Sequence, residues 1–372
     1  MSSDSWQEVV SSTSSTHSAT DDDHNNHDIN SSHKSSTNTM PKLIVSDANI
    51  DEDVAGDGLL YTLGGGLMLM FVIGIWMLGV FAPLLACGLL WNGGAFALTA
   101  LAGLVTAAVY PYMSGKGDCG GSSPTFRHAI PAWGQYWHRS CGRVYEKEGP
   151  ESWETMPPTV FCYHPHGVFT QAYILNGSLN KELPQLVGLL ATGLYHAPVF
   201  RLVFGKWAGS AAPASKEAFL TLMNKGSSFG IVPGGFQEAA LSKLGTDRVW
   251  MKNRKGFIKY ALQYGYRLRP VFTFGESDTY WNIQGMWKLR LWMTANNVPA
   301  VVPWGLWWCP LLPRRSRLMT VFSEPIVLPK VQNPSKEDVD KWHAVYIEAL
   351  ESLHRRHKAK YSSNPEGALE VW

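Results

Sequence analysis

Two histidines, His164 and His166, flank a proline at the end of a short apolar run that begins at Thr159. Imidazole titrates near neutral pH and can therefore act as a general base. The apolar residues before His164 favour a β-strand, and Pro165 ends it because proline donates no hydrogen bond to a sheet ladder. Taken alone, the segment fits two roles equally: a catalytic base at the end of a strand, or a turn whose histidines only hydrogen-bond to their neighbours.

A carboxylate, Glu238, follows a second predicted strand at residues 229–232 and the Pro-Gly-Gly turn after it. If the two strands are parallel, both end at the same edge of the sheet, where α/β proteins bind ligands. Acyl transfer from a thioester to an alcohol needs a base, a carboxylate that orients it, and donors to the oxyanion. The candidates for these roles are the bases His164 and His166, the carboxylate Glu238, and the backbone N–H groups of Gly234 and Gly235, which could also bind a phosphate.

A helix predicted at residues 254–264 opens with two adjacent cations, Arg254 and Lys255. A cationic helix start is a docking point for the phosphates of a co-substrate. A solvated helix start explains the same pair equally well.

Two other motifs are weaker. Ser228 lies in a Gly-x-Ser-x-Gly match, but a helix precedes it and a strand follows, the reverse of the nucleophile elbow, so we expect Ser228 to be dispensable. His164 and His166 have the spacing of two metal ligands, yet Pro165 disturbs that geometry and no third ligand is obvious nearby. We therefore expect no metal and no cofactor. The five cysteines form no Cys-x-x-Cys pair, which disfavours a disulfide framework.

Residues 58–115 contain no Asp, Glu, Lys or Arg. Within them, residues 59–90 and 95–112 are apolar enough to cross a bilayer as a helical hairpin that turns at residues 92–94. Basic residues follow the hairpin, which favours a cytosolic location for what comes next. The alternative is a pair of helices buried in a soluble core. Three consecutive glycines, 64–66, are tolerated better in a membrane helix than in a soluble one.

The remaining sequence predicts an α/β domain. Residues 1–57 are Ser- and Asp-rich and predicted to be disordered, and residues 116–158 are interpreted as a linker. From 159 to 372, strands alternate with helices, which is typical of an α/β sheet flanked by helices. The predicted strands are 160–163, 186–190, 229–232, 268–274 and 319–327. The predicted helices are 215–224 with Ser215 as N-cap, 254–264, and 336–359 with a Ser335–Asp338 capping box.

Four blocks in this order resemble the diacylglycerol acyltransferase type 2 family, which also includes monoacylglycerol and wax-alcohol acyltransferases. The blocks are Tyr163-His164-Pro165-His166-Gly167, Pro233-Gly234-Gly235 with Glu238, Asn253-Arg254-Lys255-Gly256-Phe257-Ile258-Lys259, and Pro270-Val271-Phe272-Thr273-Phe274-Gly275-Glu276. The likeness covers about residues 159–360. The chain is also distantly similar to glycerolipid acyltransferases with a His-x4-Asp motif, although Phe169 stands where that acid would be. Pro233 departs from the Val that is common in animal members.

The resemblance implies an acyl-CoA-dependent enzyme of the endoplasmic-reticulum membrane, with a glycerolipid-acyltransferase-like domain facing the cytosol. We expect it to transfer an acyl group to diacylglycerol, giving triacylglycerol, with His166 as the base, Glu238 orienting it, and His164 and Gly167 supporting the turn or the oxyanion. Acyl-CoA is then a co-substrate, its phosphates held by Arg254 and Lys255.

Other acceptors, monoacylglycerol or a wax alcohol, are alternatives, as is a non-catalytic membrane protein of lipid droplets. A net charge of +2 gives no reason to expect a nucleic-acid partner. The expected partners are acyl-CoA, diacylglycerol and the lipid bilayer, and self-association as a homo-oligomer stays open. Indole side chains favour the membrane interface. Six tryptophans in the second half of the chain therefore suit a bilayer surface: Trp281, Trp287, Trp292, Trp304, Trp307 and Trp308.

Overall fold

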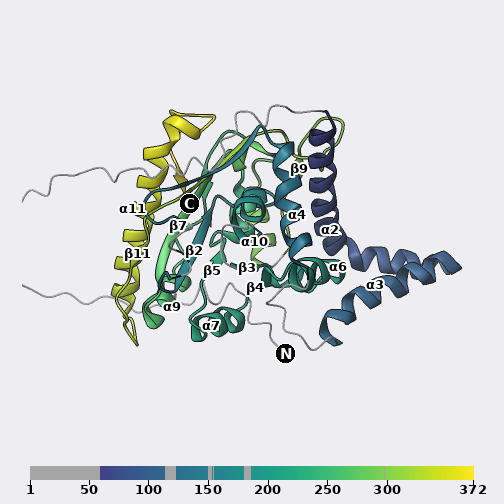
Figure 1. Cartoon of the computed structure of the whole chain (residues 1–372), viewed down its shortest axis with the longest axis horizontal. Coiled ribbons are helices and arrows are strands. Elements are labelled where there is room, and N and C mark those ends of the chain that lie inside the picture. Colours follow the sequence, from purple (N-terminus) through teal and green to yellow (C-terminus); the bar gives the residue numbers. More distant parts are fainter. Residues whose placement is uncertain (1–58, 114–122, 150–152, 154, 180–185, 297) are drawn as a thin grey trace, which may run out of the picture.

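The structure, a computed structural model, describes residues 59–113, 123–149, 153, 155–179, 186–296 and 298–372 (Figure 1). The segment 1–57, predicted to be disordered, lies outside the described residues. An eight-stranded mixed sheet forms the centre of the described part, in the order β1-β10-β7-β2-β5-β3-β4, with β11 also pairing with β7. The strands are β1 (Ser140–Tyr145), β2 (Thr159–His164), β3 (Val187–Leu190), β4 (Ala211–Pro213), β5 (Phe229–Ile231), β7 (Arg267–Phe274), β10 (Arg317–Phe322) and β11 (Ile326–Val327).

Five of these strands, β7, β2, β5, β3 and β4, run parallel to one another, whereas β10 runs antiparallel to β7 and β1 runs parallel to β10. The α/β class predicted from the sequence is therefore confirmed. Because β2, β5 and β7 are parallel, their carboxyl ends lie at one edge of the sheet, which we call the carboxyl edge.

Alternation along β2 separates two apolar layers. Val160 and Cys162 join the large core beneath α7 (Lys216–Asn224), α9 (Gly256–Tyr264) and α11 (Lys336–Tyr361), which Figure 1 shows along one side of the sheet. Phe161 and Tyr163 belong to an aromatic cluster that includes Tyr173, from η4 (Tyr173–Ser178). Successive strand residues point to opposite faces, so β2 is covered on both sides, as its six buried residues require.

Smaller elements complete the described part. The helical ones are α4 (Pro124–Gly134), η2 (Gln135–Trp137), α5 (Thr192–Tyr195), α6 (Pro198–Phe200), η5 (Arg201–Trp207), α8 (Gly235–Leu241), η6 (Glu276–Asp278) and α10 (Trp287–Ala295). The strands β6 (Arg248–Val249) and β12 (Glu370–Val371) pair with each other, as do β8 (Trp281–Asn282) and β9 (Pro303–Trp304).

Most predicted elements are observed close to their predicted bounds. Ser215 caps α7 and the Ser335–Asp338 capping box starts α11, both as predicted. The single strand predicted at 319–327 is wrong, because Pro325 lies between two strands, β10 and β11. Residues 116–158 were interpreted as a linker, but they contribute α4, η2 and the sheet strand β1.

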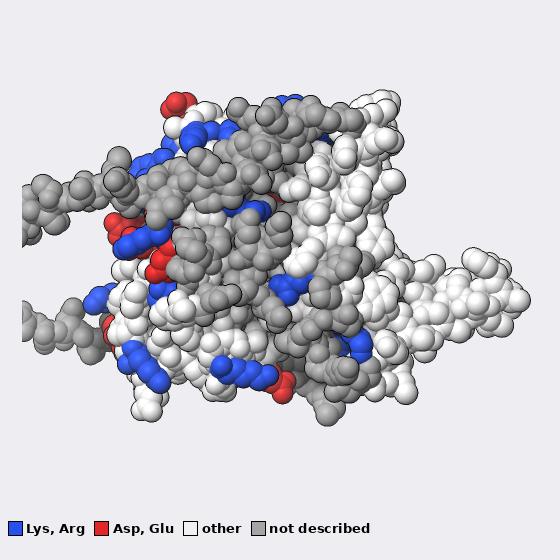
Figure 2. All heavy atoms as spheres, in the orientation of Figure 1, with Lys and Arg blue, Asp and Glu red and all other residues white. Residues whose placement is uncertain are grey.

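The apolar segment forms two helices, α2 (Leu59–Asn92) and α3 (Ala95–Met113). Leu59–Gly79 and Ala95–Met113 are each long and apolar enough to cross a membrane. Figure 1 shows α2 turning sharply partway along its length, and the helix contains Pro83, which removes one helical hydrogen bond and bends the axis. Beyond this bend, the end of α2 and the start of α3 form a projecting arm, whereas the end of α3 returns to the domain beside α6 and η5. Figure 2 shows no charged side chain on the visible face of that arm.

The first half of α2 is not a free-standing membrane helix in this structure, because it packs on the α/β domain. Val72, Ile73 and Trp76 lie in one buried cluster with Phe169 and Phe200. One face of this half packs on protein and the rest is exposed, with 39% of the candidate span Leu59–Gly79 buried, whereas α3 is mostly exposed. The membrane hairpin therefore stays a prediction. The glycine triplet has a packing role: a Cβ on Gly65 would lie 2.6 Å from the backbone nitrogen of Trp137.

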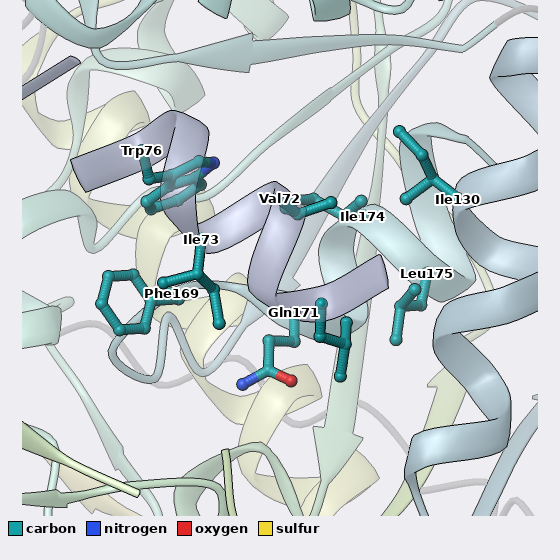
Figure 3. Close-up of a pocket in the computed structure, with 9 residues that line it drawn as sticks. Val72, Ile73, Trp76, Ile130, Phe169, Gln171, Ile174 and Leu175 are labelled. Carbon is teal, nitrogen blue, oxygen red and sulfur yellow. The ribbon is translucent and has the colours of Figure 1, made fainter. Parts of the chain in front are cut away.

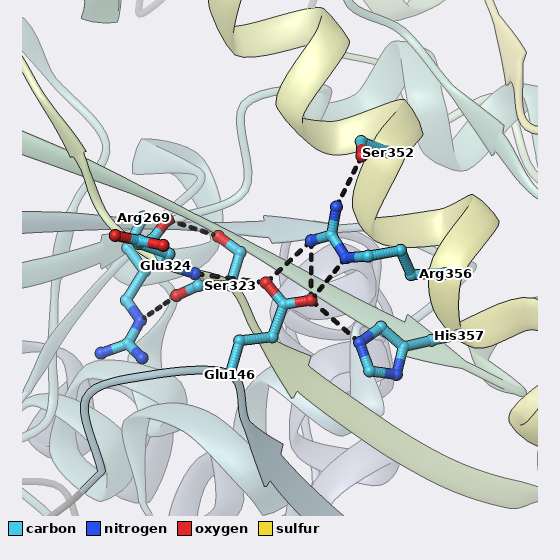
Figure 4. Close-up of polar contacts among 7 residues, drawn as sticks. All are labelled: Glu146, Arg269, Ser323, Glu324, Ser352, Arg356 and His357. Carbon is cyan, nitrogen blue, oxygen red and sulfur yellow. Dashed lines mark hydrogen bonds and ion pairs between the residues drawn. The ribbon is translucent and has the colours of Figure 1, made fainter. Parts of the chain in front are cut away.

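A buried ionic cluster joins β1 to the terminal helix (Figure 4). Glu146, which follows β1, accepts hydrogen bonds from Arg356 and from Nε2 of His357, both on α11. Glu146 N donates to the Phe322 carbonyl at the end of β10. Because β10 and β1 run against β2, this cluster lies toward the sheet edge opposite the carboxyl edge, and we interpret it as structural.

Candidate active site

Three chain segments that follow parallel strands meet at the carboxyl edge. His166 follows β2, Glu238 lies in the first turn of α8 just after β5, and Glu276 follows β7. All three side chains are buried. β2 ends at His164, as predicted, and the His164–Pro165 peptide bond is cis. The sequence-based expectation that the histidines and Glu238 share one edge therefore describes the observed arrangement.

Glu238 holds the histidine turn through its backbone. Oε1 of Glu238 accepts a hydrogen bond from the His166 backbone N–H at 2.6 Å, and Oε2 accepts one from the Trp250 N–H at 2.8 Å. The sequence predicts that the carboxylate orients the His166 ring; among the described contacts it instead fixes the main chain that carries the ring. The carboxylate is only 1% exposed, so both bonds lie in a low-dielectric environment that strengthens them.

The contacts of the His166 ring favour the tautomer that a general base needs. Nδ1 lies 3.0 Å from the Gly167 carbonyl oxygen, which can only accept, so Nδ1 carries the proton and Nε2 keeps its lone pair. Burial lowers the pKa of His166 below its usual value, an effect opposed by the Gly167 carbonyl and the charge of Glu238. A neutral imidazole with a free Nε2 lone pair can accept a proton near pH 7.

His164 has a different environment. Its Nε2 lies 2.9 Å from the hydroxyl of Tyr346 on α11, and its Nδ1 lies 3.7 Å from Oε1 of Glu238, too far for a hydrogen bond. His164 is almost completely buried. This geometry gives His164 a role in tying β2 to α11, and it favours His166 over His164 as the base.

The three glycines shape the turns. Gly167 has φ +58°, and a Cβ there would lie 2.6 Å from Oε1 of Glu276. A Cβ on Gly234 would lie 1.9 Å from Oε2 of Glu238. The Gly235 N–H donates to the Val232 carbonyl at 3.2 Å, so it is occupied within the turn rather than directed at an oxyanion. Of the two roles considered for these glycines, the turn role is the one that the contacts support.

Glu276 was missed as a site residue by the sequence reasoning. Its carboxylate accepts hydrogen bonds from the backbone N–H groups of Gln171 at 3.0 Å and Ala172 at 2.8 Å. Burial raises the pKa of Glu276 to about 7, although both hydrogen bonds lower it. A usable signal was present: like Glu238, Glu276 comes soon after the end of a predicted strand, and it ends the fourth family block.

Arg254 is not part of an exposed helix start. It precedes α9, is 7% exposed, and donates through Nη2 to Oε1 of Gln237. Burial lowers the pKa of Arg254 to about 10, and the charge of Glu238 acts in the opposite direction. Its Nε has no hydrogen-bond partner among the described residues. A buried guanidinium beside Glu238, with a donor to spare, is suited to an anion.

Lys255 points elsewhere. Its Nζ pairs with Oδ1 of Asp340 on α11 at 2.6 Å, and both side chains are partly exposed. The two cations predicted to act together are therefore separated: Arg254 lies within the site, and Lys255 lies in a surface ion pair.

Ser228 lies at the wrong end of the sheet for a nucleophile. Its Oγ accepts a hydrogen bond from the Thr159 N–H at 3.1 Å, at the first residue of β2, whereas His164 is the last. Among the described residues, no three His, Cys, Asp or Glu side chains gather as a metal ion would require. The expected absence of a metal stays a prediction.

The part of the chain that carries this site matches known proteins. A family model described as diacylglycerol acyltransferase matches residues 154–372. Human diacylglycerol O-acyltransferase 2 is 32% identical over 238 residues, covering 57% of this chain and 60% of the relative. Mouse acyl-CoA wax alcohol acyltransferase 1 is 34% identical over 218 residues, covering 53% of this chain and 66% of the relative.

The chain thus spans about 60% of the length of human diacylglycerol O-acyltransferase 2. A solved structure, the 1-acyl-sn-glycerophosphate acyltransferase PlsC from Thermotoga maritima, aligns over 82% of this chain and 98% of its own, with 15% identity and a TM-score of 0.37. Because the family model covers more than half of the sequence, this chain belongs to the diacylglycerol acyltransferase family.

Proposed function

We propose that this protein is an acyl-CoA-dependent O-acyltransferase that forms triacylglycerol from diacylglycerol. The observation that carries the proposal is the geometry of His166: its buried ring places Nδ1 3.0 Å from the Gly167 carbonyl oxygen, which favours the tautomer with the lone pair on Nε2. The family membership and the names of the relatives support the same reaction class.

In the proposed reaction, Nε2 of His166 takes the proton from the acceptor hydroxyl as its oxygen attacks the thioester carbonyl. The attack forms the ester C–O bond. The C–S bond then breaks, and the departing CoA thiolate receives the proton from His166. The reaction needs no covalent acyl-enzyme, and Ser228 lies at the opposite end of β2 from His164. Glu238 acts as a positioning residue, since its hydrogen bond to the His166 backbone fixes where the ring stands.

Arg254 is our candidate for the negative charge of the substrate or of the transition state. Its unpartnered Nε and its burial beside Glu238 support contact with an oxyanion or with a CoA phosphate. Lys255 is paired with Asp340, so the proposal assigns this contact to Arg254 alone.

We also propose that the chain is anchored in the endoplasmic-reticulum membrane with the carboxyl edge toward the cytosol. The two apolar helices support membrane association. Near the end of α3, the Arg201 guanidinium lies 3.5 Å from the Tyr112 ring centroid and Lys206 Nζ lies 4.9 Å from that of Tyr110. Aromatic rings beside cations suit the headgroup layer. Exposed Trp281, Trp292, Trp304, Trp307 and Trp308 add apolar surface of the kind expected there.

A second acceptor, a long-chain alcohol, is favoured by the likeness to the wax alcohol acyltransferase. An assay with labelled acyl-CoA and a panel of diacylglycerol, monoacylglycerol and long-chain alcohol separates these activities. Transfer to none of them would favour the alternative hypothesis of a non-catalytic membrane protein of lipid droplets.

The test of the mechanism is His166→Ala, assayed for triacylglycerol synthesis in membranes at matched expression. Loss of a general base is expected to reduce the rate by about 10²- to 10⁴-fold. Ser228→Ala is the matched control and should keep near-normal activity. Near-normal activity of His166→Ala would overturn the assignment of the base, and loss of activity in a folded Ser228→Ala would restore the hydrolase-like alternative.

A further inference from the structure

A small surface unit is formed by β8, α10 and β9, and we call residues 281–308 the tryptophan unit. Trp281 on β8 is paired with Trp304 on β9, which closes the unit at its two ends. Directly paired residues of two strands have their side chains on the same face. Nε of Arg290 on α10 donates to the Ala300 carbonyl at 3.1 Å, which ties the helix to the segment before β9. The unit is therefore compact, and its exposed side chains belong to one part of the surface.

Helix α10 is inverted relative to a surface helix of a soluble protein, which buries its apolar side and exposes its charges. The apolar Leu289 and Trp292 point outward, and Trp292 is 64% exposed. The charged Arg290 points inward, is buried, and donates to the carbonyls of Ile283 at 2.6 Å and Ala240 at 2.5 Å. An apolar outward face on a helix that buries its cation indicates that something other than water covers this face.

The side chains exposed on the tryptophan unit are mainly large and apolar, and many are indoles. Indole places an apolar ring and one N–H donor at the boundary between headgroups and acyl chains, which is why tryptophan gathers at membrane interfaces. The exposed residues that carry this argument are Trp281, Leu289, Trp292, Trp304, Trp307 and Trp308.

The charges in and around the unit favour a negatively charged lipid surface. From residue 279 to residue 323 the sequence contains no Asp or Glu. The exposed charges in this stretch of the described chain are basic, and include Lys288, Arg314 and Arg315. Apolar rings beside basic side chains are the combination found where proteins lie on anionic membranes. An acidic or mixed-charge rim, as expected around many protein partners, is missing from this stretch.

The unit also continues the exposed side of α2. Sγ of Cys309, the residue after the unit, lies 3.9 Å from Sδ of Met70 on α2. The opposite side of this helix, which carries Trp76, is turned toward Phe169 in the protein (Figure 3). Met70 borders a stripe of exposed apolar residues spaced four apart: Leu63, Leu67 and Phe71. Because α2 is the helix proposed to enter the bilayer, the tryptophan unit adjoins the same membrane.

We propose that the tryptophan unit docks on the headgroup layer of the membrane that holds α2 and α3, as a second contact beside the projecting arm. The rings of Trp292, Trp304 and Trp307 then lie at the boundary between headgroups and acyl chains, and the nearby basic side chains face anionic headgroups. The inference rests on the proposed function, which it deepens by giving this surface a lipid partner.

The tryptophan unit is joined to the candidate site through α8. Nδ2 of Asn282 lies 3.2 Å from the Ala240 carbonyl, which also accepts from Arg290. Ala240 is near the end of α8, whose first turn carries Glu238. A cation at the end of a helix also interacts favourably with the helix dipole. Docking of the unit therefore holds the carboxyl edge beside the leaflet that contains the lipid acceptor.

The direct test is photolabelling of the full-length wild-type protein in vesicles of phosphatidylcholine and phosphatidylserine. The probe is a phosphatidylcholine with a diazirine near the ester end of one acyl chain, and labelled peptides are mapped by mass spectrometry. We expect label on peptides that contain residues 286–292 and 302–308, as well as on α2 and α3. Label on α2 and α3 without label on either of those peptides overturns the proposal.

A second copy of the chain is the other occupant that this test can reveal. Chemical cross-links between the tryptophan units of two copies, with no lipid label on them, would assign the surface to self-association and overturn membrane docking. Absence of label from α2 and α3 as well would overturn the membrane anchor together with this inference.

A double variant, Trp292→Glu with Trp307→Glu, tests what docking does. Its apparent KM for diacylglycerol in the same vesicles should rise about tenfold, the effect of losing burial of one large apolar side chain. Its kcat should stay within twofold of wild type, and its KM in detergent micelles should not change. Both positions are exposed, so the melting temperature in detergent should also stay near that of wild type.

Val327→Glu is the matched control, because it places the same charge at an exposed apolar position of β11, which pairs with the start of β7 and not with its carboxyl end. This control should keep the wild-type KM in vesicles. An equal KM in the double variant and the control overturns the docking role.

The two proposals can fail separately. Acyl transfer by a wild-type protein whose tryptophan unit takes no label leaves the proposed function standing and removes this inference. Label on the tryptophan unit of a protein that transfers to no acceptor does the reverse.

Discussion

The backbone nitrogen of His166 lies 2.6 Å from Oε1 of Glu238, and this contact sets the position of the histidine ring without touching it. The second carboxylate oxygen is bonded to the Trp250 N–H, so one side chain joins the turn after β2 to the segment before Arg254. The geometry of this candidate site is thus fixed mainly by backbone hydrogen bonds to buried carboxylates.

Glu238→Gln should therefore impair the enzyme nearly as much as a loss of the side chain. A carboxamide offers one acceptor oxygen where two N–H groups need one each, and its N–H₂ would face the second donor. We expect kcat to fall about 10²-fold and the free energy of unfolding to fall by about 1–3 kcal/mol. Glu337→Gln, at an exposed position of α11, is the control. A kcat equal to wild type in Glu238→Gln would contradict this role.

The acid side of the pH–rate profile should report His166. Burial lowers its pKa, so the ring stays neutral and active below pH 6.5 and is inactivated only when the pH falls through the lowered value. Measured kcat/KM should thus rise with pH along a limb whose midpoint lies below 6.5. A limb centred above 6.5 would mean that a different group limits the reaction.

Tyr346→Phe tests the choice between the histidines. The change removes the hydrogen bond to Nε2 of His164 and leaves the His166 turn intact. We expect a loss of about 1 kcal/mol in the free energy of unfolding and a kcat within threefold of wild type. A 100-fold loss of kcat with a shifted pH profile would instead identify His164 as the base.

Glu276 should make stability depend on pH. Its pKa is raised to about 7 by burial, so the folded state retains a proton that the unfolded chain releases near pH 4.5. The stabilising contribution is complete below the unfolded pKa and is lost as pH rises through about 7, amounting to about 3 kcal/mol. Thermal unfolding in detergent between pH 5 and 8.5 should show this decline. Glu276→Gln should flatten it, and an unchanged slope in that variant would assign the dependence to another group.

Glu146 should show the opposite dependence. Burial alone would raise its pKa, but the hydrogen bonds of His357 and Arg356 outweigh burial and lower it. Its contribution is present above the unfolded value and is lost as pH falls through the lowered one. Glu146→Gln should reduce the free energy of unfolding by roughly 3 kcal/mol, at the low end for a buried pair because Arg356 is 30% exposed. KM should not change, and an altered KM would place this cluster in the substrate site.

Periodicity and turn residues predicted most of the fold because they act locally. The Ser335 capping box, the end of β2 at Pro165 and the alternation of strands and helices are all properties of a few neighbouring residues. β1 was missed because its sequence, Ser140–Tyr145, has no clear alternation and becomes a strand only by pairing with β10, far along the chain.

The sequence predicted which residues belong to the candidate site better than it predicted the contacts between them. Parallel pairing of β2 and β5 brings His166 and Glu238 together, as strand order implied. The sequence could not show that Glu238 bonds to a backbone nitrogen, nor that Arg254 is buried while its neighbour Lys255 pairs with α11. Those facts depend on side-chain direction in three dimensions, which residue spacing does not encode.

The same limit explains α2. A run of apolar residues looks alike whether it faces lipid or protein, and only the contacts of Trp76 with Phe169 and Phe200 reveal that half of the helix belongs to the core. This packing of α2 on the α/β domain has a consequence for preparing the protein without detergent. A chain cut to begin at residue 116 would expose the cluster that contains Phe169, immediately beside the histidine turn. Because the first half of α2 packs on the α/β domain, a water-soluble form is better sought by changing the outward surface of the arm than by removing α2.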